Sequence, residues 1–557
     1  MNKKDLLFYI LIIAAVLRLW GLSSGDPVSD EVFMAFRGLG MIDFDEASAQ
    51  TTPWEWFDPD RPWWTNLSMH DHPWGVPLTQ NLSMKIFGDN NFGMRLPSAL
   101  LGIGSVYLLY KIGFLLYAQE IGLIAAGILA VTLNGVYISR VGLQESYAIF
   151  AILLGIYYFL KSLRDPKYLL WVGAIIGIGA EFKYNVLILA PIFVSYLIFC
   201  RRDYFKSRYF WQGILTALIF FSPTIIYNFE LYRTAGHFDF QFSSVLGQQP
   251  EVWAVQPGKE IGSFGERIQN FIPRIIASNS WLFLSLVVVS LSAFFISIFR
   301  NFKSTIQKYF LLLIICCWLL VLLLVIGPSY RFLAMLTPFM ALSAAIFLNS
   351  VSGYSYILKN VGLTKIMIVM FSAIFSFEIF YSINNQIISY PFGPNPWLAS
   401  NVRYENYNWG YNELAEYLEK ELSGKIPAIT FDVKYQFLED LRKKALDKGR
   451  AEGLDLYPAL LVYEGNFDGG AKLWVLDRLH IYHAWPIISL QTYYADLQQN
   501  GFDYFDRVGF KNFYFILQTN IAPSPEINAL SHGVPIIIKN KRGDDVFKIY
   551  KQQITNF

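Results

Sequence analysis

The stretch KKDLLFYILIIAAVLRLWGLSSGDPVSDE, residues 3–31, decides how the chain begins to fold. Lys3-Lys4 precedes an apolar run over residues 6–22, which is long enough to cross a bilayer as a helix. The acid pair Asp30-Glu31 follows that run after a short polar segment. A carboxylate at a membrane–water boundary is ionised and adjacent to lipid-borne substrates. The stretch therefore predicts a first membrane helix followed by a candidate catalytic base.

The composition extends this prediction to most of the chain. Of the 557 residues, 54% are hydrophobic and only 16% are charged, and the mean hydropathy is +0.35. These values exceed those of ordinary soluble proteins, so most of the chain is expected to lie in a bilayer. The net charge of +2 gives no reason to expect a nucleic-acid partner. The three cysteines lie in or beside apolar runs, which leaves the polar C-terminal part without a disulfide framework.

Apolar runs of spanning length predict about eleven transmembrane helices. They lie at residues 6–22, 92–117, 121–138, 146–163, 168–180, 186–199, 210–229, 280–299, 309–326, 332–350 and 366–383. Lys and Arg cluster at residues 3–4, 161–167, 201–208, 300–308 and 359–365, and each cluster is separated from the next by an even number of spans. Because cationic loops face the cytoplasm, all five clusters are expected on that side. The pattern predicts an integral plasma membrane protein with a cytoplasmic N-terminus. The loops over residues 23–91 and 231–279 are then expected on the outer side.

The composition changes after residue 383. Pro391, Pro394 and Pro396 form a linker that interrupts regular structure. Beyond this linker, residues 411–422 have the periodicity of an amphipathic helix, and apolar runs at 428–431, 460–463, 513–517 and 534–538 predict strands. The sequence thus predicts a polytopic α-helical membrane module over residues 1–390 and an extracytoplasmic α/β domain over residues 400–557.

Single cations occupy short turns on the predicted outer side. Arg140 precedes Glu145, Lys183 follows an acid, and Arg331 follows Tyr330. Each cation alone could be an interfacial anchor or a salt-bridge partner. Because Arg matches phosphate oxygens through paired donors, the cations together predict a site for the phosphate of a lipid-linked substrate. A nearby carboxylate could take the proton of an acceptor hydroxyl while the cations stabilise the departing phosphate, which is glycosyl transfer.

Three motifs of the first loop resemble those of a known family. They are HPWGVPL at residues 72–78, Phe87-Gly88, and RLPSALLG at residues 95–102. In this order they resemble the first-loop signature of the family 39 GT-C glycosyltransferases, a group that includes protein O-mannosyltransferases and the lipid A aminoarabinose transferase. The resemblance covers about residues 1–350.

The resemblance implies a GT-C fold, a polyprenyl-phosphate sugar donor and an inverting single displacement at an extracytoplasmic site. Asp30 would be the base, and Glu31 would orient or bind. The resemblance further implies two groups of residues: Arg140, Lys183, Tyr330 and Arg331 at the donor phosphate, and Glu145, His72 and Arg95 in support or at the substrate. The acceptor does not carry over, so a protein, a lipid and a glycan all remain open.

The sequence His70-Asp71-His72 places two imidazoles and a carboxylate in tight spacing. With Asp30 or Glu31, this group could hold a divalent metal. The alternative, which the position ahead of Pro73 favours, is that His72 is a loop residue that packs on the acceptor side. A divalent metal is therefore possible, and the sequence requires no cofactor.

Two other functions are compatible with a many-helix chain of this kind. A transporter of a lipid-linked or anionic substrate would place ionisable groups near the bilayer midplane, often in repeated halves, whereas the charges described above lie at predicted helix ends. An oligosaccharyltransferase-like enzyme would use a pyrophosphate-linked glycan and depend on a divalent metal.

Overall fold

The computed structural model describes residues 2–27, 30–45, 51–253, 262–357, 361–519 and 534–553. Parts of both predicted outer loops, and Lys359 among the predicted cytoplasmic cations, lie outside these residues. The chain divides into two compact units. The first contains Met1–Leu22, Asp45–Thr51 and Trp63–Tyr404, and the second contains Ser23–Phe44, Thr52–Pro62 and Glu405–Phe557.

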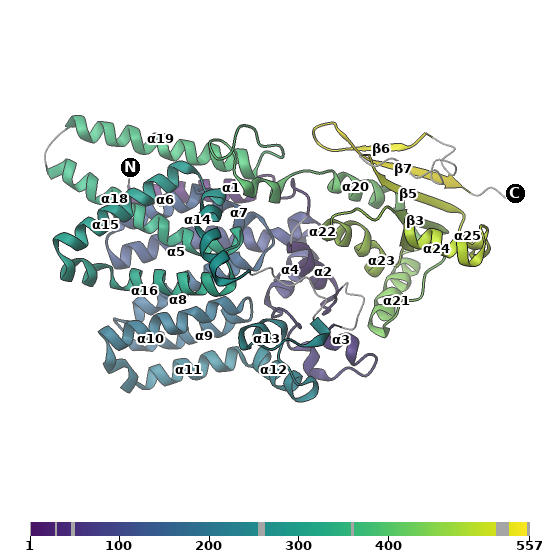
Figure 1. Cartoon of the computed structure of the whole chain (residues 1–557), viewed down its shortest axis with the longest axis horizontal. Helices are drawn as coiled ribbons and strands as arrows, with labels where there is room; N and C mark the ends of the chain where they lie inside the picture. Colours follow the sequence, from purple (N-terminus) through teal and green to yellow (C-terminus); the bar gives the residue numbers. More distant parts are fainter. Residues whose placement is uncertain are drawn as a thin grey trace. The chain divides into compact units, whose positions relative to one another are not determined.

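The first unit is helical. Its α-helices are α1 (Lys3–Leu19), α4 (Gly75–Phe87), α5 (Asn91–Leu116), α6 (Gln119–Val131), α7 (Leu133–Arg140), α8 (Gln144–Ser162), α9 (Leu169–Ala180), α10 (Leu189–Cys200), α11 (Arg208–Phe220), α12 (Ser222–Ala235), α13 (Phe240–Leu246), α14 (Phe264–Ser278), α15 (Trp281–Arg300), α16 (Phe302–Ile326), α17 (Tyr330–Leu333), α18 (Thr337–Ile357) and α19 (Val361–Gln386). The helices α5, α6, α8, α9 and α11 run side by side, as Figure 1 shows. One continuous apolar core lies among them.

Four helices of the described residues are long and apolar enough to cross a membrane. They are Asn91–Leu116, Trp281–Arg300, Phe302–Ile326 and Tyr330–Ser352. Two bent pairs qualify if each is counted as one span: Gln119–Val131 with Leu133–Arg140, and Arg208–Phe220 with Ser222–Ala235, bent by 60° and 61°. These helices agree with a polytopic bundle, while the number of eleven spans stays a prediction.

The bend between α6 and α7 is held by a buried arginine of α1. A bend of this size interrupts the helical hydrogen-bond ladder and frees carbonyl oxygens. Arg18, which is 1% exposed, donates to the carbonyls of Ala130 at 2.9 Å and of Leu129 and Gly135 at 3.2 Å each. Carbonyls at a helix end carry partial negative charge, so they can receive a buried guanidinium.

The second unit combines helices with a mixed sheet. Its α-helices are α2 (Glu31–Gly40), α3 (Pro53–Trp56), α20 (Tyr411–Leu422), α21 (Gln436–Ala451), α22 (Gly469–Lys472), α23 (Arg478–His483), α24 (Leu490–Asn500) and α25 (Tyr504–Val508), and a π-helical turn covers Leu473–Asp477. Its strands are β1 (Lys425–Pro427), β2 (Asp455–Tyr457), β3 (Ala459–Tyr463), β4 (Ile487–Ser489), β5 (Asn512–Gln518), β6 (Ile536–Lys539) and β7 (Asp545–Gln553). The strand order in the main sheet is β4-β3-β5-β7-β6, with β3 parallel to β4 and β5 and with β7 antiparallel to β5 and β6.

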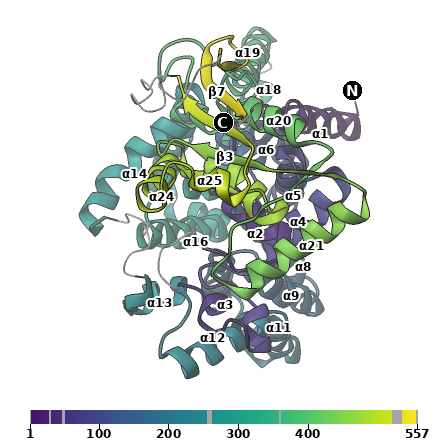
Figure 2. The same cartoon turned by 90° about the vertical axis from the view of Figure 1, so that its right-hand side faces the viewer.

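Helices cover both faces of this sheet, as the alternation of side chains along a strand requires. Phe513 and Phe515 of β5 pack in an apolar cluster with residues of α24 and α25. Tyr514 and Ile516 of the same strand pack on the other face with residues of α20. Figure 2 shows α24 and α25 next to β3. The unit therefore has a core on each side of its sheet.

Two aspartates of the first loop cap helices of the C-terminal residues. Helix α20 begins after Gly410, which has a φ of 104° and no side chain to cap the helix. Asp26 accepts hydrogen bonds there from the backbone N–H groups of Gly410 at 2.8 Å, Tyr411 at 3.1 Å and Asn412 at 2.9 Å. The N–H groups at a helix start lack partners within the helix, and the Asp26 carboxylate accepts from three of them.

Helix α21 is capped in the same way. Its N-cap residue, Tyr435, makes no side-chain cap. The carboxylate of Asp58 accepts from the backbone N–H groups of Gln436 at 2.6 Å and Phe437 at 3.2 Å. These contacts explain why residues 23–44 and 52–62 belong to the second unit, although the sequence-based division assigned the whole loop over residues 23–91 to the first module.

Replacing Asp26 by Ala should destabilise the second unit by about 2 kcal/mol, at the upper end of what a lost N-cap costs, because several N–H groups lose their acceptor together. Hydrogen exchange of the backbone amides at residues 409–412 and thermal unfolding of the full chain measure this effect. The matched control is Asp447→Ala, which removes an exposed carboxylate from α21. Unchanged exchange at residues 409–412 would show that Asp26 is not the cap.

Candidate active site

A buried ion pair joins two of the predicted site residues in the first unit. Glu145 lies in the first turn of α8, and its side chain is 1% exposed. Lys183 follows the end of α9, and its Nζ lies 2.7 Å from Glu145 Oε1. A carboxylate removed from water requires such a partner, because burial otherwise favours its neutral form.

A second cation shares the same carboxylate oxygen. Arg331 of α17 places its Nε 3.6 Å from Glu145 Oε1. The Nζ of Lys183 lies 4.9 Å from the ring centroid of Phe332, the next residue of that helix. The structure therefore brings Glu145, Lys183 and Arg331 together from three separate elements. Two cations therefore contact one carboxylate oxygen.

The cluster borders a pocket with more basic side chains. The pocket has a volume of about 590 Å³, and its lining includes Arg267, Arg274 and Asn270 of α14 together with Arg331. Arg267 Nη1 donates to the carbonyl of Leu324 at 3.0 Å, and Arg274 Nη1 donates to that of Pro328 at 3.2 Å. These bonds hold two guanidinium groups at the wall of the pocket. Glu266 is the acid in the lining, so the pocket is basic overall.

The amphipathic pattern of α14 explains why its arginines share one face. Arg267 and Arg274 are seven residues apart, which is close to two helical turns. Phe264, Ile268, Ile272 and Ile276 recur at the spacing of one turn, and all four are exposed. The sequence analysis did not identify the two arginines, because it treated residues 231–279 as one loop. The helical period of these apolar residues was the signal that could have found them.

Arg140, predicted at the donor phosphate, and Arg95, predicted in support or at the substrate, both contact main-chain carbonyls. Arg140 is 1% exposed and donates to the carbonyls of Trp20 and Gly21, both at 2.8 Å. Arg95 is equally buried and donates to the carbonyl of Leu22 at 3.0 Å. Both side chains thus bind carbonyls just after α1. In the described part of the chain, neither forms an ion pair with Glu145.

The hydroxyl of Tyr330 accepts a hydrogen bond from Asn401 Nδ2 at 3.2 Å. Tyr330 directly precedes Arg331 in the sequence. Among the described residues, however, the pocket lining includes Arg331 and not Tyr330.

The acid pair lies in the second unit. Asp30 directly precedes α2 and is exposed, whereas Glu31 lies in the first turn of α2 and is 0% exposed. The two neighbouring acids therefore differ in solvent access. An exposed carboxylate can exchange a proton with a substrate, and a buried one is better placed to orient its neighbours.

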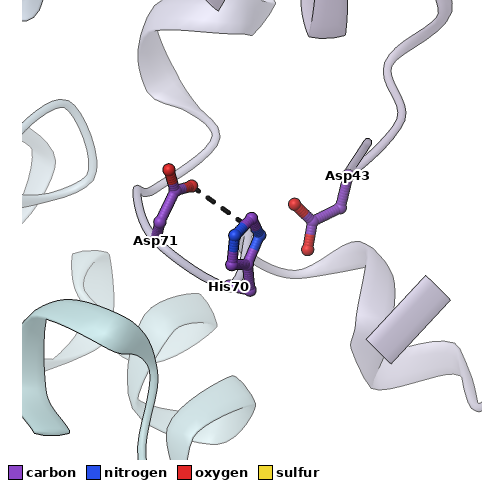
Figure 3. A group of neighbouring side chains, drawn as sticks. All are labelled: Asp43, His70 and Asp71. Atoms are coloured by element: carbon purple, nitrogen blue, oxygen red, sulfur yellow. Dashed lines mark ion pairs between the residues drawn. The ribbon is translucent and has the colours of Figure 1, made fainter. Parts of the chain in front are cut away.

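A histidine and acid cluster lies in the first unit. His70 is 0% exposed, and its Nε2 lies 3.3 Å from Asp45 Oδ2. Its Nδ1 lies 3.8 Å from Asp71 Oδ1, the contact that Figure 3 marks. His72 Nδ1 lies 3.0 Å from the other oxygen of Asp71. Asp43, also drawn in Figure 3, belongs to the second unit.

The side chains of His70, His72, Asp45 and Asp71 are of the types that hold divalent metals. Burial, with a smaller effect of the Asp71 charge, raises the pKa of nearby Asp239 to about 6. The acidic surroundings of His70 would favour a cation. The imidazole nitrogens that would bind a metal face carboxylate oxygens, so the residues fit either a metal or an ion-paired histidine.

Comparison with known proteins shows similarity to mannosyltransferases in part of the sequence and to glycosyltransferase structures in the fold. The family described as dolichyl-phosphate-mannose-protein mannosyltransferase matches residues 71–227. Two Bacillus subtilis proteins named as mannosyltransferases, YycA and YkcB, are 28% and 25% identical over 207 and 211 residues, each 36% of this chain. The alignments span 28% and 26% of the two relatives, so the chain matches little more than a quarter of their length.

Solved structures extend the likeness to nearly the whole chain. ArnT from Cupriavidus metallidurans in the apo state has a TM-score of 0.53 at 10% identity, over 98% of this chain and 98% of that chain. The oligosaccharyltransferase of Archaeoglobus fulgidus has a TM-score of 0.53 at 14% identity, over 93% of this chain and 69% of that chain. At these identities the likeness concerns the fold. The resemblance to GT-C glycosyltransferases drawn from the first-loop motifs is thus confirmed.

The ion pair of Glu145 and Lys183 yields a prediction about stability. Glu145→Ala should destabilise the protein by about 3–5 kcal/mol, because it removes the carboxylate that pairs with a buried ammonium. The double variant Glu145→Gln/Lys183→Met removes both charges and should recover most of that loss. Thermal unfolding of the purified protein in detergent measures the three forms. A double variant less stable than Glu145→Ala would contradict the pairing.

Proposed function

We propose that the protein is a membrane glycosyltransferase that moves a sugar from a polyprenyl-phosphate donor to an acceptor hydroxyl with inversion. The observation that carries this proposal is the pocket lined by Arg331, Arg267 and Arg274, beside the buried ion pair of Glu145 and Lys183. Guanidinium groups bind phosphate oxygens through paired donors, so a phosphate suits the basic wall of this pocket. The fold shared with ArnT supports the same class of donor, since ArnT has also been solved with undecaprenyl phosphate.

The donor phosphate is proposed to bind at Arg331. This side chain is 23% exposed and lines the pocket, so it can reach a ligand, whereas Lys183 is largely buried against Glu145. Arg267 and Arg274 add donors along the same wall. Cations fixed before the reaction stabilise the charge that develops on the departing phosphate without reorganisation. Glu145 holds the two cations in place and takes no proton in this scheme.

Asp30 is the proposed general base. The acceptor hydroxyl oxygen bonds to the anomeric carbon, its proton passes to the Asp30 carboxylate, and the bond from that carbon to the phosphate oxygen breaks. The electron pair of the broken bond stays on the phosphate, where the cations bind it. A single displacement of this kind inverts the anomeric centre. Glu31, which is buried, is assigned to orienting Asp30.

Arg140 and Arg95 are assigned a supporting role. Their hydrogen bonds to the carbonyls of Trp20, Gly21 and Leu22 fix the chain where it leaves α1. This is the segment that leads toward Asp30. His72, whose imidazole contacts Asp71, is assigned to the substrate side of the first loop. The acceptor class stays open among proteins, lipids and glycans, and the site is proposed to be extracytoplasmic with the N-terminus in the cytoplasm.

A metal-dependent, oligosaccharyltransferase-like reaction is the second candidate. The cluster of His70 with Asp45 and Asp71 favours it, as does the fold shared with the Archaeoglobus fulgidus enzyme. In such an enzyme the metal would supply Lewis-acid chemistry at the phosphate. Adding a chelator to the transfer assay distinguishes the two candidates. The rate of the favoured reaction should not change, because it needs no divalent ion, whereas the rate of the metal-dependent reaction should fall.

The role of Asp30 is tested by sugar transfer from a polyprenyl-phosphate sugar to an acceptor, using purified full-length protein. Asp30→Asn should lower the rate by at least about 100-fold, since it removes the proton acceptor, while donor binding stays unchanged. Asp447→Asn, which alters an exposed carboxylate of α21, should keep the native rate. Equal rates for native protein and Asp30→Asn would remove Asp30 as the base.

The donor site is tested by the dependence of the same rate on donor concentration. Arg331→Ala should raise the KM for the donor by about tenfold or more, because a charge-assisted contact to phosphate is lost, and should leave the KM for the acceptor unchanged. Arg331→Lys should be intermediate, since it keeps the charge without the paired donors. Arg300→Ala, at the C-terminal end of α15, is the control. An unchanged donor KM in Arg331→Ala would place the phosphate elsewhere.

A further inference from the structure

Helix α14 has an exposed apolar side along its whole length. Four large apolar side chains recur there every four residues, with exposed fractions of 61%, 50%, 60% and 46%: Phe264, Ile268, Ile272 and Ile276. This spacing places them along one side of the helix. Phe271 and Ile275 of the same helix pack against the core of the first unit instead. The helix therefore has a second apolar side, which its packing on the bundle leaves exposed.

The two arginines of α14 attach it to the end of a long apolar helix. Arg267 donates to the carbonyl of Leu324, in the last turn of α16, and Arg274 donates to that of Pro328, just after α16. Helix α16 is long and apolar enough to cross a membrane. The predicted cytoplasmic cations at residues 300–308 lie at its other end, so its C-terminal end is expected at the outer membrane boundary. The arginines thus hold α14 at that boundary.

The C-terminal end of α14 lies at the same boundary. The helix ends at Ser278, and α15, a second helix of spanning length, begins at Trp281. The ring centroid of Trp281 lies 5.5 Å from that of Trp397, and its Nε1 donates to the Trp397 carbonyl at 3.3 Å. The two side chains are 36% and 58% exposed. Because tryptophan is enriched where membrane meets water, this pair marks the depth at which α14 ends.

These contacts determine the direction of α14 relative to the membrane. Figure 1 shows α14 at one end of α15 and α16, in agreement with the contacts of its arginines. A helix held at one boundary both by its arginines and by its C-terminal end lies along the membrane surface. Its 15 residues are also too few to span a bilayer.

The surface next to α14 indicates what covers its exposed side. Val325 of α16, whose carbonyl also accepts from Arg267, has a side chain that is 53% exposed, and Val288 of α15 is 61% exposed. Exposed apolar side chains on helices of spanning length face lipid. A helix at the membrane surface with arginines on one side and large apolar residues on another buries the apolar side where headgroups meet acyl chains. Acyl chains are therefore the occupant that fits this side of α14.

We propose that α14 is an interfacial helix of the outer leaflet, with its exposed apolar side inserted among lipid acyl chains. The inserted side chains are those of Phe264, Ile268, Ile272 and Ile276. Insertion fixes one wall of the basic pocket at the depth of the lipid headgroups, because Arg267 and Arg274 of the same helix line that pocket. The lipid contact of α14 does not depend on the proposed function, and it can be measured without any sugar donor.

Photocrosslinking of the full-length protein in phosphatidylcholine nanodiscs tests this contact. The variant Ile272→p-benzoyl-phenylalanine carries a ketone that, when excited, reacts with nearby C–H bonds and relaxes unreacted in water. Intact mass measures the yield of lipid adduct. The same replacement at Val288 of α15 is the positive control, and at Phe502, which is 92% exposed in the second unit, the negative control. The yield at Ile272 should lie within about twofold of that at Val288 and at least about tenfold above that at Phe502, because acyl chains surround the first two positions.

A lipid yield at Ile272 no higher than that at Phe502 would overturn the proposal. A crosslink from Ile272 to protein in place of lipid would also overturn it, because a second copy or another segment of this chain would then cover α14. If the Ile272 variant cannot be purified, Phe264→p-benzoyl-phenylalanine provides the second variant, since it keeps an aromatic ring at an exposed position, and the same outcomes apply.

Discussion

The Glu145 carboxylate between Lys183 and Arg331 is the contact on which the proposed site depends. A buried carboxylate is tolerated only with cationic partners, and it in turn holds those cations where water would otherwise screen them. The pocket beside this cluster is lined by Arg267, Arg274 and Arg331, which gives the proposed donor phosphate a place to bind.

The same principle of satisfying charge and backbone polarity organises the rest of the chain. Arg18, Arg95 and Arg140 are buried, and each binds main-chain carbonyls at a helix end or bend. In the second unit, Asp26 and Asp58 bind the N–H groups at the starts of α20 and α21. Charged side chains thus stabilise the polar ends of helices in both units.

Local sequence patterns predicted much of the fold. The amphipathic period of residues 411–422 and the apolar runs of β3 and β5 predicted those elements with nearly correct bounds. Glu145, Lys183 and Arg331 were also identified, because cations and acids at predicted helix ends are conspicuous in an apolar chain. The caps were not predicted, since Asp26 and Asp58 contact backbone groups more than 370 residues away and nothing in the local sequence marks such a pair. The sequence also could not show whether Arg140 binds a ligand or main-chain carbonyls. Either role places an arginine at the end of an apolar helix, so the local sequence is the same.

The most direct test of the proposed donor site is a structure of the full-length protein determined in a lipid nanodisc with added polyprenyl phosphate. The phosphate should lie within hydrogen-bond distance of the Arg331 guanidinium, in the pocket that Arg267 and Arg274 line. The same density should be missing when Arg331 is replaced by Ala. A phosphate bound away from Arg331, with this pocket free of it, would contradict the account.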